Sequence, residues 1–320
     1  MKNRAYDTFH SYGITKQRLI LVSSVKTHKE LLDYIKRDNS LDLEIRENYI
    51  NIYYLGGNIL KVSKNGDTYN FGFDFNYLKQ SPFLREATIL KHQTDQNWNA
   101  YFPLVKQAMD FFFSKNAKEE REFQQLVVRE NNYSSIANST DYFVIDIEYD
   151  NQAGARFDIV AIEWPSVSSN RKLQKDFKPK LVVIEMKYGD GALTGSAGMK
   201  KHCDDFNTFI SNTTCQNDFK TEMLTLFRQK RLLGLIPCLS VSGNNNDVQV
   251  FNDEIEMLFL ISNHDPASSI LQSELTGLVN EKVKFITSNF MGYGLYNQNT
   301  FDFSQFSARF SKQIYELQNP

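Results

Sequence analysis

The sequence is poor in cysteine: it has three, Cys203, Cys215 and Cys238, and no two of them form a CxxC pair. An odd count without paired spacing is typical of reduced thiols in a cytoplasmic protein rather than of a disulfide framework. Three thiolates also fall short of the four that an iron–sulfur cluster normally takes. We therefore expect neither disulfides nor such a cluster.

Long hydrophobic runs are absent as well. Apolar runs such as Leu181–Ile184 are far shorter than the stretch of about 20 residues that crosses a bilayer. Residues Met1–Asp7 contain no apolar segment of the kind found in a signal peptide. We expect a soluble, cytoplasmic protein without a membrane partner.

An excess of positive charge is also missing. Lys and Arg number 36 and Asp and Glu 38, so a nucleic-acid partner would need a local basic patch. The five histidines form neither an HExxH motif nor a pair spaced for zinc. No Gly-Lys-Ser/Thr sequence completes a Walker A motif, so no ATP-driven motor of the P-loop class is expected.

What is present suffices for a large core. The 320 residues are 41% hydrophobic and 23% charged, which fits one large domain or two modest ones. Aromatic content is high at 13%, with 25 Phe and 16 Tyr. We interpret these rings mainly as a Phe-rich core, with stacking platforms for unpaired bases as the alternative.

Residues 1–95 are expected to form a separate α+β module. Thr27–Arg37 has the apolar spacing of an amphipathic helix. Three strand-like runs follow, Tyr49–Leu55, Asn58–Val62 and Thr68–Phe73, and Gly-Gly and Asn-Gly pairs separate them. This pattern predicts an antiparallel β-meander, which fits a scaffold and a recognition module equally well.

Residues 96–320 are expected to form one α/β domain with a mixed central sheet flanked by helices. Its predicted elements, in chain order, are helices Tyr101–Ser114 and Lys118–Asn131, strands Tyr142–Tyr149, Arg156–Trp164 and Leu181–Tyr188, helices Ala197–Ile210 and Asp218–Leu233, and strand Glu256–Ser262. A helix opened by Asp265-Pro266, a strand Val283–Thr287 and a helix Ser304–Leu317 complete the prediction.

The run Leu181–Lys187 ends an apolar strand with two charges. Side chains alternate along a strand, so Glu185 and Lys187 point to the same face. A strand this hydrophobic belongs in the middle of a sheet, where charged groups need partners. Taken alone, the pattern fits an intrastrand salt bridge at an exposed strand end.

The preceding strand favours a catalytic interpretation, because Asp158 stands at the start of another apolar run. Carboxylates from two neighbouring strands make a hard oxygen site suited to Mg²⁺. A lysine beside such a site can orient water and steady negative charge on phosphorus.

Arg156-x-Asp158 followed by Glu185-x-Lys187 resembles the signature of the PD-(D/E)XK, or restriction-endonuclease-like, nucleases, with Phe157 in place of the name-giving proline. The resemblance covers about Lys118 to Ser262. It implies a core of helix, three-strand meander, helix and strand, and metal-dependent phosphodiester hydrolysis, usually of DNA. It also implies that Asp158 and Glu185 bind Mg²⁺ or Mn²⁺ and that Lys187 assists the attacking water.

Further acids are candidates to complete the site. Nucleases of this superfamily often use a carboxylate from the helix before the meander, which favours Glu122 over Glu119 and Glu120. A solvated acidic first turn that complements the helix dipole explains these residues equally well. On the first strand of the meander, Asp146 or Glu148 either joins Asp158 or lies on a hydrated face.

Candidate substrate-binding residues surround these strands. Lys172 and Lys175 belong to a basic loop between the second and third strands, and phosphate contacts from it would make binding salt-dependent. Ser196 is the expected N-cap of the next helix, and Lys200 and His202 follow in its first turns. A solvated loop and an ordinary helix start are the alternatives.

The sequence therefore predicts a Mg²⁺- or Mn²⁺-dependent nuclease, with DNA favoured over RNA and endonuclease action expected. It would act as a homodimer or with a partner protein. Lys187→Ala is expected to abolish cleavage without lowering thermal stability. The alternative is a catalytically silent nucleic-acid-binding module or a structural partner subunit of a defence or repair complex.

Overall fold

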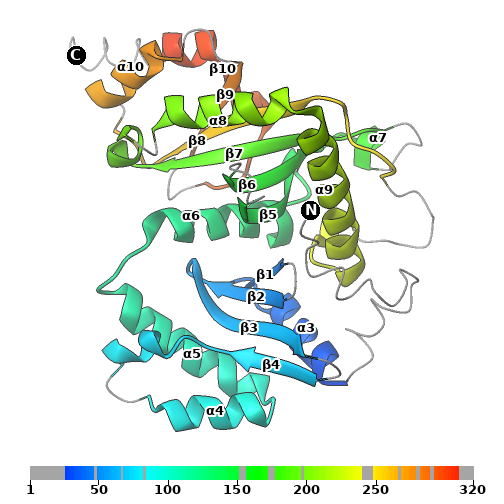
Figure 1. The fold of residues 1–320 in the computed structure, drawn as a ribbon, viewed down its shortest axis with the longest axis vertical. Helices are drawn as coiled ribbons and strands as arrows, with labels where there is room; N and C mark the ends of the chain where they lie inside the picture. Colours follow the sequence, from blue (N-terminus) through cyan, green and yellow to red (C-terminus); the bar gives the residue numbers. More distant parts are fainter. Residues whose placement is uncertain are drawn as a thin grey trace. The chain divides into compact units, whose positions relative to one another are not determined.

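The computed structural model divides the chain into two compact units (Figure 1). Unit 1 comprises Met1–Arg129 and Gln229–Ser240, and unit 2 comprises Glu130–Arg228 and Val241–Pro320. This division differs from the boundary at residue 95 that the sequence suggested. The structure describes residues 26–309 except 47–48, 66–67, 82–83, 151–155, 172–176, 196–197, 240–247, 266–267, 279–281 and 289–291.

Unit 1 contains a four-stranded antiparallel sheet in the order β1-β2-β3-β4. Its strands are β1 (Asp42–Ile45), β2 (Tyr49–Tyr54), β3 (Gly57–Asn65) and β4 (Thr68–Gly72). The predicted meander is confirmed, but β1 was missed. Its sequence, DLEI, alternates acidic and apolar residues as a short half-exposed segment would, yet all four residues are buried.

A tight turn joins β2 to β3. Leu55 and Gly56 both have positive φ, at 48° and 72°, as a type I′ hairpin turn requires. Gly56 also lies against helix α6 (Glu119–Val128), where an added Cβ would come within 2.5 Å of the Cβ of Arg121. Glycine is therefore needed here both for backbone conformation and for space.

Two helices contact strands of this sheet, α6 at β2 and α5 (Trp98–Phe113) at β3, and three further helical elements pack on α5. The three are α3 (Lys26–Arg37), the 3₁₀ helix η1 (Phe75–Gln80) and α4 (Glu86–Thr94). The predicted apolar side of α3, with Leu31 and Ile35, is buried. Tyr101 of α5 donates a hydrogen bond of 2.7 Å to the carbonyl of Ile59 in β3. The change from strand to helix near residue 95 is thus no domain boundary, because α5 packs on the meander.

Unit 2 contains a six-stranded mixed sheet in the order β10-β9-β8-β7-β6-β5. Its strands are β5 (Tyr142–Asp150), β6 (Arg156–Glu163), β7 (Lys180–Tyr188), β8 (Ile255–Ser262), β9 (Val283–Ser288) and β10 (Phe301–Asp302). β5, β6 and β7 are antiparallel, whereas β7, β8 and β9 are parallel. The mixed α/β class is confirmed, and the hydrophobic strand β7 lies inside the sheet, as predicted.

The helices predicted in unit 2 occur in the predicted order, together with a short helix and several helical turns that were not predicted. In chain order, the helical elements are the π-helical turn η2 (Arg129–Tyr133), α7 (Ser168–Arg171), η3 (Asp190–Ala192), α8 (Met199–Ser211), α9 (Thr213–Leu233), α10 (Ser269–Thr276), η6 (Asn297–Asn299) and residues 303–309. The last turn of α9 and η5 (Pro237–Leu239) belong to unit 1. The predicted helix start at Asp265 is wrong, because Ser268 caps α10 through its side chain; Pro266 lies outside the described residues.

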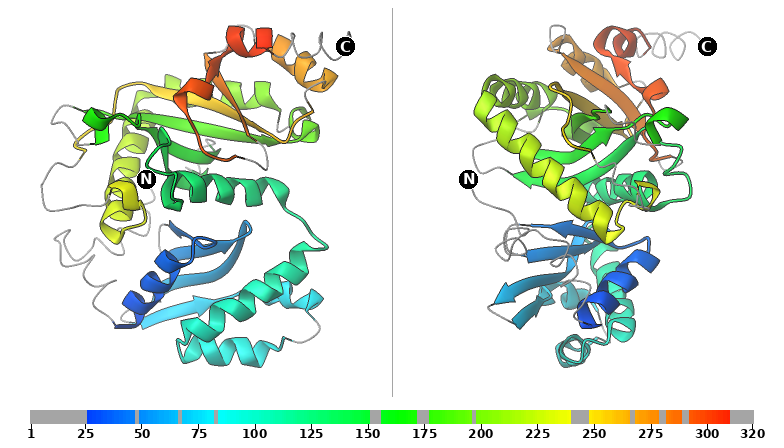
Figure 2. Two further views of the ribbon diagram at one scale, coloured as in Figure 1. Left: turned by 180° about the vertical axis from the view of Figure 1, so that it is seen from behind. Right: turned by 90° about the vertical axis from the view of Figure 1, so that its right-hand side faces the viewer.

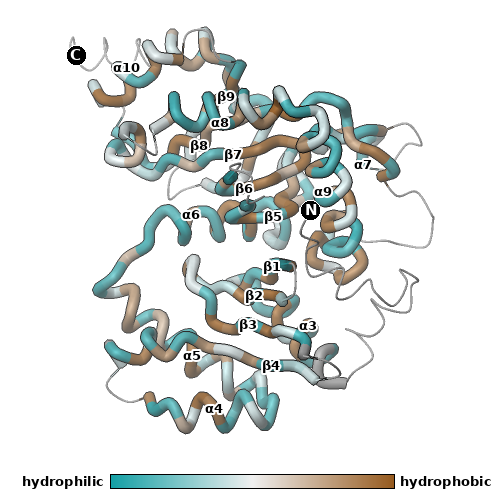
Figure 3. Tube along the Cα trace, viewed as in Figure 1, coloured by the Kyte–Doolittle hydropathy of each residue, from teal (hydrophilic) through white to brown (hydrophobic). Residues whose placement is uncertain are grey.

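Helices α8 and α9 lie on the same face of this sheet (Figure 2). Phe209 of α8 and Phe219 of α9 both contact Phe157 of β6, with ring centroids 5.3 Å and 6.0 Å away. Hydrophobic residues run along β6 and β7 (Figure 3). The aromatic residues thus form a Phe-rich core, as expected. Within the described residues, no helix is both long and apolar enough to span a bilayer.

A buried asparagine stabilises the first strand of this sheet. Pairing of β5 with β6 shifts register between Val144 and Asp146. The fully buried Asn132 of η2 donates to the carbonyl of Val144 and accepts from its N–H, both at 2.9 Å. This amide replaces the partners that the irregular pairing removes.

Replacing Asn132 with alanine is expected to lower the free energy of unfolding of unit 2 by about 2–3 kcal/mol, because both backbone groups of Val144 lose a buried partner. Urea denaturation measures this change. Asn217→Ala, on the exposed side of α9, is the matched control and should cost at most about 0.5 kcal/mol. Equal losses for the two variants would contradict the role given to Asn132.

Candidate active site

Asp158 of β6 lies beside the end of β7. Ile159 pairs with Ile184, and continuing this register by one residue puts Asp158 opposite Glu185. Oδ2 of Asp158 accepts a hydrogen bond of 2.8 Å from the main-chain N–H of Met186. The carboxylate of Asp158 is therefore fixed next to the residue that separates Glu185 from Lys187.

Glu185 and Lys187 form a buried ion pair. Only 5% of Glu185 and 3% of Lys187 is exposed, and Lys187 Nζ donates to Glu185 Oε1 at 3.0 Å. Both side chains lie on the same face of β7, as predicted. The intrastrand salt bridge that the sequence left as an alternative is thus present, but it is buried rather than at an exposed strand end. Burying two charges is costly, so this arrangement calls for an explanation beyond stability.

His202 of α8 completes the surroundings of Glu185. Its Nε2 lies 2.9 Å from Glu185 Oε1, although the ring N–H does not point along this line as a hydrogen bond would require. Burial raises the pKa of the Glu185 carboxyl, but the contact with His202 and the charge of Lys187 outweigh it and hold the pKa below its ordinary value. Glu185 is therefore anionic at neutral pH.

The carboxylates of Asp158 and Glu185 suit a hard divalent cation. Both contacts of Glu185 use Oε1, and its Oε2 makes no hydrogen bond with the described residues. The carboxylates of Asp158 and Glu185 are neighbours on adjacent strands. Mg²⁺ is commonly held by one or two carboxylates and by water, so this donor set fits it. No cluster of three or more Asp, Glu, His or Cys residues arranged to hold a metal occurs among the described residues.

The other candidate acids lie in different settings. Asp146 is fully buried, whereas Glu148 is exposed and has a positive φ of 52°. The expected hydrated face of β5 therefore holds for Glu148 but not for Asp146. Glu122 belongs to unit 1, where burial, followed by the charge of Glu119, raises the pKa of its carboxyl. Its participation in the site stays a prediction.

The candidate substrate-binding residues are only partly placed. Lys172, Lys175 and Ser196 lie outside the described residues. The predicted N-cap is nevertheless wrong, because α8 begins at Met199 with Gly198 as its cap. Lys200 is half-exposed and forms an ion pair with Asp204 one turn further along α8. Such surface pairs are weak, and the contact of Lys200 with a phosphate stays a prediction.

One more histidine lies beyond the carboxyl ends of the parallel strands and was not singled out from the sequence. His264 follows β8, and burial lowers its pKa while Asp190 and Asp265 oppose this shift. The main-chain N–H of Asp265 donates to Asp190 Oδ1 at 3.5 Å. Ligands of open α/β sheets bind beyond strand ends of this kind. The position of His264, two residues past an apolar strand, was the available signal.

Comparisons of the chain with protein-family models, with curated proteins and with solved structures found no match. The functional conclusion therefore depends on the residues and their geometry. The six-stranded mixed sheet flanked by helices is established. The likeness of its core to restriction endonucleases remains a proposal.

Proposed function

We propose that unit 2 is a metal-dependent nuclease domain of the PD-(D/E)XK type, with DNA as its substrate. The observation that carries this proposal is the bond from the Met186 N–H to Asp158, which holds this carboxylate beside Glu185 and Lys187. Two acids and a lysine meet at one strand end, where a buried charge pair would otherwise be a liability.

Each of the three side chains has a distinct role in this proposal. Asp158 and Glu185 would hold Mg²⁺ or Mn²⁺, and the bound cation supplies Lewis-acid activation of the phosphate. Lys187, kept in place by its bond to Glu185 Oε1, orients the attacking water and steadies negative charge that develops on the phosphate oxygens. The hydrogen bond from Met186 prevents Asp158 from turning away.

The direct test is a cleavage screen with the full chain. Single- and double-stranded DNA and RNA are incubated with the protein and Mg²⁺ or Mn²⁺, and EDTA is the control. We expect DNA to be cut only when the cation is present. Calorimetric titration of Mg²⁺ into the wild type and into Asp158→Asn measures cation binding, and the variant should bind more weakly by at least about tenfold.

Two results would overturn the proposal. Cleavage that continues in EDTA would show that the reaction does not require a metal ion. Absence of both cleavage and cation binding, with salt-sensitive DNA binding retained, would identify a silent nucleic-acid-binding module instead. Cleavage of RNA alone would keep the chemistry and change the substrate.

A further inference from the structure

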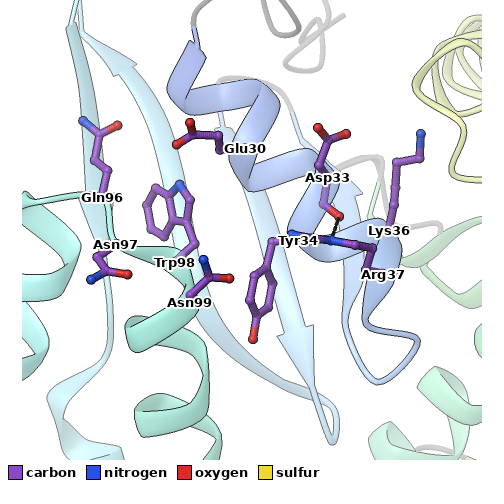
Figure 4. A pocket seen from close by; sticks show the side chains of 9 residues that line it. All are labelled: Glu30, Asp33, Tyr34, Lys36, Arg37, Gln96, Asn97, Trp98 and Asn99. Atoms are coloured by element: carbon purple, nitrogen blue, oxygen red, sulfur yellow. Dashed lines mark hydrogen bonds between the residues drawn. The ribbon is translucent and has the colours of Figure 1, made fainter.

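Unit 1 contains a pocket of about 740 Å³ that the proposed nuclease chemistry does not use (Figure 4). One wall is formed by α3, with Tyr34, Lys36 and Arg37 among its side chains. The other wall is the turn from α4 into α5, residues Gln96–Asn99. A volume of this size lies within the range of small-molecule and cofactor sites.

A buried hydrogen-bond donor in this pocket has no partner in the described part of the chain. Trp98 is only 4% exposed, yet its Nε1 makes no hydrogen bond with the described residues. The indole lies between Gln96 and the side chains of α3, and in Figure 4 its nitrogen is on the edge nearest Glu30. Trp164, the only other tryptophan, donates from Nε1 to the carbonyl of Asn170 at 3.1 Å. Buried indole N–H groups normally find such a partner, so a ligand is the natural one for Trp98.

A matching acceptor stands two residues before this donor. Oε1 of Gln96 is buried and also makes no hydrogen bond with the described residues. The backbone of Gln96 has a positive φ of 52°, a conformation that costs energy for a residue with a long side chain. The turn thus keeps a strained glutamine where glycine would be more stable, and this glutamine lines the pocket.

The chemistry of the two walls indicates the ligand. The Watson–Crick edge of every nucleobase carries a hydrogen-bond acceptor beside an N–H donor, which complements the indole N–H and the Gln96 carbonyl oxygen. Tyr34 stacks one face on Phe102, with centroids 4.7 Å apart, and its ring lines the pocket, where a base could stack on it. Arg37 and the N-terminus of α5 supply positive potential for a phosphate, although Glu30 and Asp33 line the same wall.

A sugar fits this pocket less well. Carbohydrates usually pack on the open face of an indole, but the ring of Trp98 contacts Phe71, Tyr101 and Phe102, with centroids 5.3–6.1 Å apart. The unused part of Trp98 is therefore its polar edge, which suits the edge of a planar heterocycle.

We propose that this pocket of unit 1 binds one unpaired nucleotide, with its base between Trp98, Gln96 and Tyr34. The proposal stands on the pocket itself, and it deepens the proposed function by naming a nucleic acid with an unpaired base as the substrate class. Unit 1 would then be a recognition module, which is one of the two roles that its β-meander was predicted to fit.

The indole N–H groups of the two tryptophans allow nucleotide binding to be followed by NMR. With ¹⁵N-labelled tryptophan, the full chain gives two indole N–H signals, and Trp98→Phe assigns them. Titration with the 5′-monophosphates of adenosine, guanosine, cytidine and uridine should move the signal of Trp98 downfield as its N–H gains a partner. The signal of Trp164 should stay in place, because its N–H is already bonded.

Gln96→Gly provides the variant that tests the contact. Glycine relieves the positive φ, so the fold is retained while the acceptor is removed. The dissociation constant of the preferred nucleotide should rise about tenfold, as expected when one hydrogen bond is lost. Leu55→Gly, at another position of unit 1 where a residue other than glycine has positive φ, is the matched control and should leave binding unchanged.

The outcomes separate this proposal from the proposed function. A shift of Trp98 with nucleotides that persists in EDTA and in Lys187→Met supports the pocket whether or not DNA is cut. DNA cleavage without any shift of Trp98 would overturn the pocket and leave the nuclease standing. An equal shift with ribose 5-phosphate or with a neutral methyl glycoside would overturn the assignment to a base.

Discussion

Replacing Lys187 with methionine is expected to lower the rate of metal-dependent cleavage by at least about 100-fold, because the donor that steadies developing charge on the phosphate is lost. Methionine keeps the length and apolar stem of lysine, so the packing inside the sheet changes little. Single-turnover cleavage of a labelled DNA measures the loss.

Stability must be measured on the same variant. Lys187 is 3% exposed and pairs with an equally buried Glu185, so removing its charge leaves the Glu185 carboxylate inside the protein, beside the Asp158 carboxylate and in contact with His202. Breaking a buried pair in this way costs about 3–5 kcal/mol. The sequence led us to expect no loss of thermal stability when Lys187 is replaced. Because the lysine is buried, we now expect a loss.

Two further variants separate chemistry from folding. Glu185→Gln combined with Lys187→Met removes both charges and should recover most of the stability while cleavage stays absent. Lys180→Met is the matched control, because Lys180 lies at the other end of β7 and pairs with Glu254 and Glu256. It should lose stability and keep cleavage. If Lys187→Met cleaves at the rate of the wild type, the lysine has only a structural role.

The proposed catalytic residues could be found from the sequence because their signals are local or nearly local. Glu185 and Lys187 end an apolar run, and the alternation of strand side chains alone puts them on one face. Asp158 required one more step, the antiparallel pairing of β6 with β7, which two successive apolar runs joined by a loop make plain. Hydrophobic periodicity and strand parity thus carried this part of the prediction.

The sequence did not allow us to predict features that depend on contacts between residues far apart in the chain. Asn131 is fully buried because its amide bonds the carbonyl of Tyr293 and the N–H of Leu295, more than 160 residues away. Gln125 likewise bonds the carbonyls of Ser40 and Tyr53. Such amides look like surface residues in the sequence, because their partners are backbone groups that no side-chain pattern marks. Strand β1 was missed for a similar reason, because its acidic residues look like surface residues in the sequence but are buried in unit 1.

The buried pair of Lys230 and Glu44 gives the second large effect, in unit 1. Both side chains are fully buried, and Lys230 Nζ donates to Glu44 Oε1 at 2.7 Å. The pair joins the last turns of α9 to β1 across 186 positions of the sequence. It thereby fixes the returning segment Gln229–Ser240 in unit 1.

Lys230→Met is expected to lower the free energy of unfolding of unit 1 by about 3–5 kcal/mol, because the Glu44 carboxylate stays buried after its ammonium partner is removed. Adding Glu44→Leu should restore most of this loss, since two apolar residues of similar volume replace the pair. The double-mutant cycle then gives the coupling energy directly.

Each unit holds one of the two tryptophans, Trp98 in unit 1 and Trp164 in unit 2, so unfolding can be followed separately in each. With 5-fluorotryptophan, the ¹⁹F signal of Trp98 should report the earlier transition of Lys230→Met. Lys106→Met removes a lysine whose pair with Asp38 is partly exposed, and it should shift this transition much less. Equal shifts for the two variants would mean that the Lys230–Glu44 pair does not fix the returning segment, and that the last turns of α9 are held in unit 1 by their apolar contacts instead.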